Sequence, residues 1–195
     1  MRVAYDDLAD DYADARDEAS TPEPVERFRD ALAPDDDVLS AGCGAGDAPL
    51  VAGGERGVGL DCSREQLTRA RASLPAVLVQ GDLTALPFAA DSFDAVAALY
   101  SLIHVPLDEH RPVLEEFARV LRPGSTLLVT EGETEWTGSN PDWLDSGTAM
   151  HWWMAGAAAT RADLRAVGFD LRDEWRVRDP TTEAGETPFF LAVLG

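Results

Sequence analysis

Three glycines, Gly42, Gly44 and Gly46, stand close together directly after a short apolar run over Asp37–Ala41. That run is typical of a buried strand. Where a parallel strand turns into a helix, glycines let a ligand approach the backbone, and the first N–H groups of the helix point toward it. The segment is therefore a candidate ligand loop, although a tight turn without a ligand would have the same composition.

An acid stands at the end of the next apolar run, where Asp61 follows Gly57–Leu60. A carboxylate at that edge of a sheet can accept hydrogen bonds from both hydroxyls of a ribose. A dinucleotide fingerprint would need a third glycine where this chain has Asp47, and an anion there would repel a pyrophosphate. The pattern favours a nucleoside ligand without phosphates, such as the cationic S-adenosylmethionine. A helix-capping role for Asp61 is the alternative.

Predicted strands and helices alternate around these residues. The alternation predicts an α/β fold, with a Rossmann-like, seven-stranded, mostly parallel sheet and helices on both faces. The last two strands are joined by a short polar turn with no room for a crossover helix, so we expect an antiparallel C-terminal strand. Beyond the runs already given, the predicted strands are Ala76–Gln80, Phe93–Leu99, Thr126–Thr130, Phe169–Val177 and Pro188–Leu194, and the predicted helices are Arg64–Ser73 capped by Ser63, Asp108–Leu121, and Arg161–Val167 capped by Thr160.

Two regions fall outside the alternation, although 195 residues indicate a single domain over 1–195. Residues 1–34 are expected to form an N-terminal helical cap, with helices over Met1–Ser20 and Glu23–Ala33. Residues 131–154 hold four of the five tryptophans and are too long for an ordinary connection. We expect this tryptophan-rich insert to be a lid or a pocket wall. A satellite hydrophobic cluster under a long loop is the alternative.

Five motifs, in this order, resemble those of the class I S-adenosylmethionine-dependent methyltransferases, of the small-molecule type called methyltransferase type 11. They are Tyr5–Tyr12, which resembles the family's N-terminal helix, then Val38–Gly46, Gly59–Asp61, Gly81–Leu83 with Leu86–Phe88 and Asp91–Asp94, and Val120–Gly124. The resemblance implies S-adenosylmethionine as cofactor and methyl transfer to a small-molecule acceptor. Ser40 stands where that family usually has an acid, so a catalytically inactive protein that binds the cofactor or a partner is an alternative.

The resemblance also implies which residues hold the cofactor. The glycine loop would hold the methionine end, Asp61 the ribose, and Asp82 the adenine amino group. The full set of implied cofactor-binding residues is Tyr12, Gly42, Cys43, Gly44, Gly46, Asp61, Cys62, Asp82, Leu83 and Leu99.

His104 is the strongest candidate for a catalytic base. It follows Phe93–Leu99 at the sheet edge where the methyl group should lie, and an imidazole pKa of about 6.5 suits proton transfer. Displacement at a sulfonium needs mainly alignment, so a base is required only where the acceptor must lose a proton. Glu131 and Tyr100 are further candidates. His151, in the tryptophan-rich insert, could touch the substrate or lie at the surface.

The chain is strongly acidic, with 16 basic residues, all arginine, against 36 acidic ones, and a net charge of −20. This composition argues against non-specific binding to nucleic acid. It resembles that of proteins from a salt-rich cytoplasm, although a GC-rich genome would also favour arginine. No apolar stretch is long enough for a signal peptide or a membrane span. We therefore expect a cytoplasmic protein without a metal, acting on a small acceptor rather than on RNA or protein, and the oligomeric state stays open.

Overall fold

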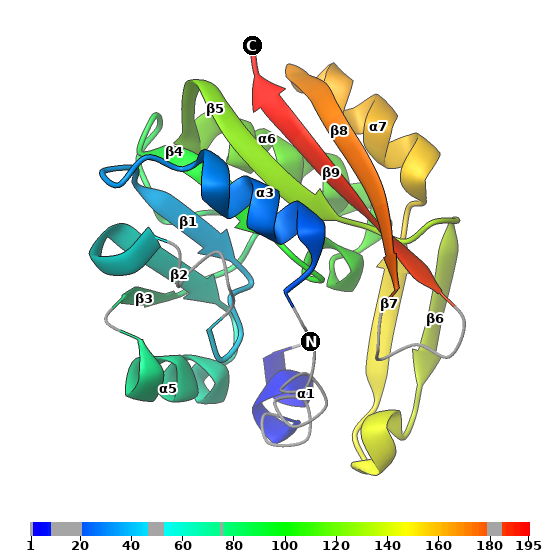
Figure 1. Cartoon of the computed structure of the whole chain (residues 1–195). Helices are drawn as coiled ribbons and strands as arrows, with labels where there is room; N and C mark the ends of the chain where they lie inside the picture. The colour runs from blue at the N-terminus through cyan, green and yellow to red at the C-terminus, as the bar shows by residue number, and fades with distance from the viewer. Residues whose placement is uncertain (1, 9–20, 47–52, 75, 179–184) are drawn as a thin grey trace.

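A seven-stranded sheet crosses the molecule in the order β3-β2-β1-β4-β5-β9-β8 (Figure 1). The computed structural model describes residues 2–8, 21–46, 53–74, 76–178 and 185–195. The first five strands run parallel, whereas β9 pairs antiparallel with both β5 and β8. The predicted fold class is thus confirmed. The strands are β1 (Val38–Ala41), β2 (Gly57–Asp61), β3 (Val77–Gln80), β4 (Phe93–Ala98), β5 (Leu121–Thr130), β8 (Phe169–Arg178) and β9 (Glu186–Leu194).

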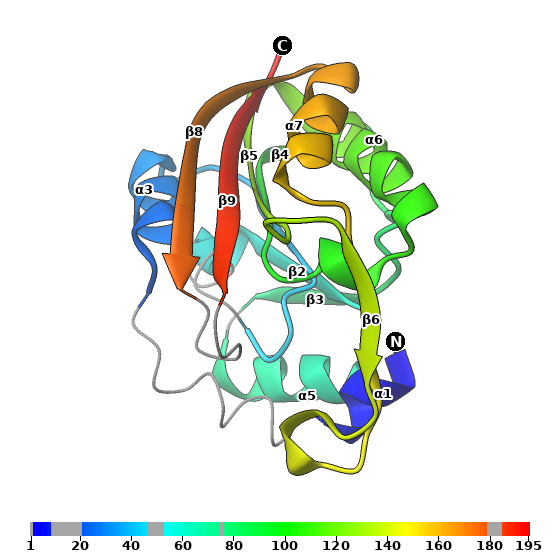
Figure 2. The same ribbon diagram turned by 90° about the vertical axis from the view of Figure 1, so that its right-hand side faces the viewer.

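Helices cover both faces of this sheet, with α3 on one face and α6 and α7 on the other (Figure 2). None of the helices that the structure describes could span a membrane. The helices are α1 (Arg2–Asp7), α3 (Glu23–Ala31), α5 (Arg64–Ser73), α6 (His110–Val120) and α7 (Ala157–Ala166). Short 3-10 turns are η1 (Gly54–Arg56), η2 (Leu102–His104), η3 (Leu107–Glu109) and η4 (Trp143–Asp145).

The central strand β4 shows why the sheet is parallel and covered on both sides. Val96 and Ala98 belong to the larger core cluster, which also holds the apolar face of α6. Ala95 and Ala97 belong to a second cluster, which holds Phe28 of α3. A strand that is buried on both faces carries a continuous apolar run rather than an alternating one, and such runs occur mostly in parallel sheets.

The structure changes the expected start of two elements and confirms one expected helix cap. The strand predicted over Thr126–Thr130 begins five residues earlier, because Leu121 already pairs with Phe93 of β4. Thr160 is not a helix cap, because α7 begins at Ala157 and the Thr160 hydroxyl donates to the Gly156 carbonyl 3.0 Å away inside the helix. Ser63 is a cap as predicted, since its hydroxyl accepts from the Gln66 N–H at 3.1 Å.

The N-terminal helix is seen in part. Within the predicted Met1–Ser20, the structure describes a helix over Arg2–Asp7, and residues 9–20 lie outside the described residues. Residues 47–52, directly after the glycine loop, also lie outside the described residues.

The tryptophan-rich insert forms an antiparallel hairpin of its own. Its strands β6 (Trp136–Asn140) and β7 (Met150–Met154) make a separate two-stranded sheet joined by η4. The sequence Met150-His151-Trp152-Trp153-Met154 has no polar–apolar alternation, which is the usual signal of a half-buried strand. The sequence therefore indicated the insert but not its hairpin.

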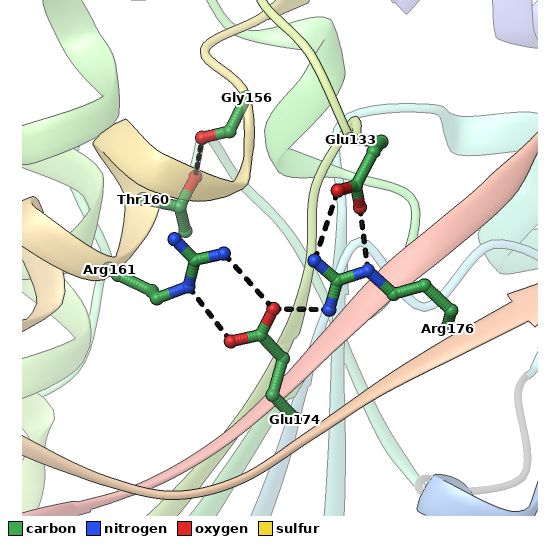
Figure 3. A network of polar contacts seen from close by, with 6 residues as sticks. All are labelled: Glu133, Gly156, Thr160, Arg161, Glu174 and Arg176. Atoms are coloured by element: carbon green, nitrogen blue, oxygen red, sulfur yellow. Dashed lines mark hydrogen bonds and ion pairs between the residues drawn. The ribbon is translucent and has the colours of Figure 1, made fainter.

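An arginine–glutamate network fixes the base of this hairpin (Figure 3). Arg176 of β8 pairs with Glu133 at 2.8 Å and also with Glu174. Glu174 in turn accepts from Arg161 of α7 at 2.9 Å. The Ala157 N–H donates to the Glu133 carbonyl, so the two ends of the insert are tied to each other and to the sheet.

Gly156, where the hairpin returns to α7, offers a test of this anchoring. Its φ is +85°, and a Cβ there would lie 2.7 Å from the backbone nitrogen of Glu135. Gly124 is a matched control, because its φ is +83° and a Cβ there would meet nothing within 4 Å. We expect Gly124→Ala to cost about 1–2 kcal/mol of unfolding free energy and Gly156→Ala clearly more, because only the second adds a backbone clash. Urea denaturation measures both, and equal losses would contradict the anchoring.

Candidate functional site

The glycine loop leaves β1 in a backbone conformation that side chains rarely adopt. Gly42, Gly44 and Gly46 have φ values of +81°, +53° and +111°. A Cβ on Gly42 would lie only 2.4 Å from the Cβ of Ser101, which follows β4. The Ser101 hydroxyl donates to the Ala41 carbonyl at 3.0 Å. The loop is therefore pressed against the segment that leads to His104.

Asp61 holds the loop from the other side. Its Oδ2 accepts from the Gly44 N–H at 2.9 Å, and its Oδ1 accepts from the Ser63 N–H at 2.8 Å. Burial raises the pKa of Asp61 above its ordinary value, in spite of these two hydrogen bonds. The backbone and the thiol of Cys62 also bond this carboxylate. Asp61 leads into α5 as well, so the structure shows its helix-directing role.

Asp82 and Leu83 follow β3 beside Asp61, because the Gly81 N–H donates to the Asp61 carbonyl at 3.0 Å. Asp82 is exposed, and its Oδ1 accepts from both the N–H and the hydroxyl of Thr84. Among the described residues, no donor bonds its Oδ2. Leu83 is half-buried against the larger core.

The other predicted cofactor-binding residues differ in burial and in which of their groups lie near the loop. Cys43 is buried against Leu67, and its thiol donates to the Gly44 carbonyl of the loop at 3.6 Å. Burial and the Asp61 charge raise the pKa of Cys62 to about 11, so its thiol stays neutral. Leu99, directly after β4, is half-buried against the core cluster on the α3 side. Tyr12 lies outside the described residues.

Gln66 is a residue that sequence reasoning missed. Gln66 is 1% exposed, and neither its amide nitrogen nor its amide oxygen has a hydrogen-bond partner among the residues that the structure describes. The oxygen Oε1 lies 3.9 Å from where a Cβ on Gly44 would stand. Buried amides without partners are uncommon and usually have a functional reason. A buried glutamine one turn after a capping serine carries no signal in the sequence.

His104 lies on η2, with both ring nitrogens hydrogen-bonded. Its Nδ1 is 3.0 Å from the carbonyl of His151, and its Nε2 is 2.8 Å from the hydroxyl of Tyr5. Its ring lies 6.0 Å from that of Trp152. The hairpin therefore packs directly on the candidate base, and α1 covers it from another side.

The tryptophans of the insert gather around that contact. Trp152 lies 5.4 Å from Trp143, edge to face, and 6.3 Å from Trp136. His151 is exposed and stacks on Trp153 at 5.9 Å, so it contributes its carbonyl to His104 rather than its ring.

The other two candidate bases have structural partners. Tyr100 has a φ of +53°, and its N–H donates to the Thr130 hydroxyl at 2.6 Å, which holds the sharp turn after β4. Glu131 is buried, its Oε1 accepts from the Gly132 N–H, and its Oε2 lies 3.2 Å from Nδ1 of His110. His110 also bonds the Val105 carbonyl through Nε2 at 2.9 Å. Among the described residues no group of three or more acids, cysteines or histidines is placed to hold a metal.

Residues 39–129 match the sequence profile of a family described as methyltransferase domain. The match covers 91 of the 195 residues. Among curated proteins, a demethylmenaquinone methyltransferase from Mycobacterium sp. (strain KMS) is 42% identical over 96 residues, which cover 49% of this chain and 40% of that protein. An O-methyltransferase from Aspergillus sclerotiorum is 35% identical over 104 residues, 48% of this chain and 39% of that protein. The chain thus spans well under half the length of these relatives.

The likeness in fold to solved structures extends beyond the matched range. Magnesium protoporphyrin IX methyltransferase from Synechocystis PCC 6803, solved with bound SAH, superposes with a TM-score of 0.75 over 100% of this chain and 98% of that one. The two are 16% identical, so this likeness concerns the fold alone. Gly42, Asp61 and His104 lie inside residues 39–129, whereas Tyr5 and Trp152 lie outside them. The residues that cover His104 are thus not part of the shared domain sequence.

The buried His110–Glu131 pair predicts how stability depends on pH. Burial alone would lower the pKa of His110, but the hydrogen bond and charge of Glu131 outweigh it, and the pKa of His110 is raised. The pair therefore stabilises the fold fully below the unfolded pKa of about 6.5, and this contribution is lost as pH rises through the higher folded pKa. We expect the unfolding free energy to fall over that range in the wild type.

His110→Gln should be less stable by about 3–5 kcal/mol, because it leaves a buried carboxylate without a cation, and its stability should vary less with pH above neutrality. His151→Gln, at an exposed position, is the control and should keep the wild-type profile. Urea titrations at several pH values measure this, and an unchanged profile in His110→Gln would show that the pair is not the source.

Proposed function

We propose that this chain transfers a methyl group from S-adenosylmethionine to a small-molecule acceptor. The observation that carries the proposal is the placement of the Asp61 carboxylate, which bonds the Gly44 N–H of the glycine loop at the carboxyl edge of the sheet. The methyltransferase domain over residues 39–129 supports it. Residues 1–34 would act as a helical cap and residues 131–154 as a lid within one domain.

The residues present fit this cofactor. The loop backbone would receive the methionine end, the Asp61 carboxylate the ribose hydroxyls, and Oδ2 of Asp82 the adenine amino group. The unpartnered amide of Gln66 beside Gly44 is a buried polar group that a ligand of the loop would satisfy. A surface with a net charge of −20 suits a cationic ligand and not a pyrophosphate.

The bound cofactor supplies a methyl carbon on a sulfonium, and the electron pair of the broken C–S bond stays on sulfur. Where the acceptor carries an O–H group, His104 would receive its proton at Nε2 while the oxygen bonds the methyl carbon. The His151 carbonyl favours this role, because it holds the other ring proton on Nδ1. The tryptophans beside His104 exclude water and suit an acceptor with an apolar body.

A small acceptor is favoured over a nucleic acid, because the chain has no lysine and few cations with which to displace counterions. The same composition supports a cytoplasmic protein from a salt-rich cell. The proposed compartment and the preference for a small acceptor rest on the composition. The proposed acceptor site rests on the hairpin and α1.

Asp61→Ala tests the proposal. We expect calorimetric titration with S-adenosylmethionine to show at least about tenfold weaker binding than for the wild type, because hydrogen bonds to a charged group are worth ~1.5–3 kcal/mol. Asp170→Ala, which removes an exposed carboxylate from β8, should bind as the wild type does. The wild type should also prefer adenosine to 2′,3′-dideoxyadenosine, and Asp61→Ala should not. Wild-type binding by Asp61→Ala would refute the ribose role.

Gln66→Met gives an independent test of the loop. The free protein should be equally stable or more stable by up to about 1–3 kcal/mol, because an amide buried without a partner is replaced by an apolar side chain of similar size. Binding of S-adenosylmethionine should weaken at the same time. Thermal unfolding with and without the ligand measures both effects. A variant that is less stable and binds normally would show that the amide serves the fold instead.

A further inference from the structure

The candidate base, His104, is already hydrogen-bonded to a phenol group of the protein itself. The Tyr5 side chain of α1 places its hydroxyl 2.8 Å from Nε2 of His104. The two rings meet edge to face, with centroids 5.3 Å apart and an interplanar angle of 84°. This is a favourable aromatic arrangement, so both the ring and the hydroxyl of Tyr5 are matched to the histidine.

The hydrogen-bond directions at His104 follow from its partners. A carbonyl oxygen can only accept, so the contact between Nδ1 and the His151 carbonyl places a proton on Nδ1. Nε2 of the neutral ring then carries the lone pair, and the Tyr5 hydroxyl donates to it. The nitrogen that would take a proton from an acceptor is therefore engaged by a phenolic O–H in this structure.

Helix α1 is anchored where it presents Tyr5. The next residue, Asp6, accepts from the Ser63 hydroxyl at 2.7 Å and from the Glu65 N–H at 3.3 Å, at the start of α5. Leu8 is fully buried one turn further on. Tyr5 thus reaches His104 from a helix with its own contacts to the body of the protein.

The surroundings of this phenol are aromatic and contributed by the hairpin. Trp152 lies against His104, and Trp136 and Trp143 lie against Trp152. None of these three side chains carries a charge. A flat ring can pack against such walls edge to face, whereas a saturated ring of the same size cannot make those contacts.

We propose that the acceptor is a planar aromatic compound with a ring hydroxyl, and that it replaces the Tyr5 side chain on His104. This inference rests on the proposed function and names its substrate class. The acceptor hydroxyl would take the bond to Nε2, and its ring would take the place of the tyrosine ring beside Trp152. A phenolic proton, with a pKa of about 10, is within reach of an imidazole base, whereas the proton of an aliphatic alcohol is far less acidic.

Tyr5 and the acceptor then compete for one position, so α1 must turn aside for the acceptor to bind. Removal of the tyrosine ring should therefore strengthen acceptor binding. A residue that merely stabilised the fold would weaken binding when removed, so the direction of the change separates the two roles.

The test uses the full chain, with and without S-adenosylhomocysteine, and follows the fluorescence of the tryptophans beside His104. The probes are 2-naphthol, naphthalene, which lacks the hydroxyl, and decahydro-2-naphthol, which lacks the planar ring. We expect 2-naphthol to bind about tenfold or more tightly than either analogue, a difference of ~1.4 kcal/mol. Tyr5→Ala should bind 2-naphthol about fivefold or more tightly than the wild type, because the competing phenol is gone.

Two variants serve as controls. Val3→Ala changes an exposed residue of the same helix, 60% exposed, and should leave naphthol binding unchanged. His104→Ala should bind naphthol and naphthalene equally, because the hydroxyl preference comes from Nε2. Equal binding of decahydro-2-naphthol, or weaker naphthol binding in Tyr5→Ala, would overturn the inference.

Failure of the proposed function has a different signature. It would appear as no calorimetric binding of S-adenosylhomocysteine, whatever the naphthol titrations of the free protein give. Normal binding of S-adenosylhomocysteine without a preference for 2-naphthol would overturn the acceptor class alone.

Discussion

One buried carboxylate organises the site. Asp61 bonds the Gly44 N–H of the loop and the Ser63 N–H at the start of α5, so a single group joins the ends of β1 and β2 to the next helix. Ser63 also links this group to α1, because its hydroxyl donates to Asp6. The carboxylate is kept out of water at an energetic cost, which its hydrogen bonds offset only in part. The position of the glycine loop and the position of α1, which covers His104, are therefore both fixed relative to Asp61.

The candidate cofactor site and the surroundings of His104 come from different parts of the chain. The sheet edge with its glycines and acids lies within residues 39–129, the range of the methyltransferase domain. The parts that contact His104 come from α1 and from the hairpin, before and after that range. The network of Arg176, Glu133 and Glu174 ties the hairpin to β8, so the added part stands on the rigid sheet. Specificity can then vary without disturbing the frame.

The sequence predicted the frame well, because buried strands and glycine turns are local signals. The strand order places Asp61 beside the loop as expected, and Ser63 caps α5. It predicted the start of α7 wrongly at Thr160, because three alanines in a row extend the helix back to Gly156. It could not predict the partner of His104, because Tyr5 lies 99 residues away and the contact depends on how α1 docks. The unpartnered amide of Gln66 was equally out of reach, because burial without a partner is a property of packing.

The outermost strand, β3, bears on how copies of this protein behave toward one another. It is four residues long and leaves Val77 57% exposed at the open edge of the sheet. Open edges invite pairing with another chain, and short edge strands limit it. A net charge of −20 also keeps copies apart, but only over a Debye length, which is about 10 Å at 0.1 M salt and about 3 Å at 1 M. At 1 M salt, long-range repulsion therefore contributes little, and at this edge of the sheet the brevity of β3 limits pairing; the other edge is the ten-residue strand β8.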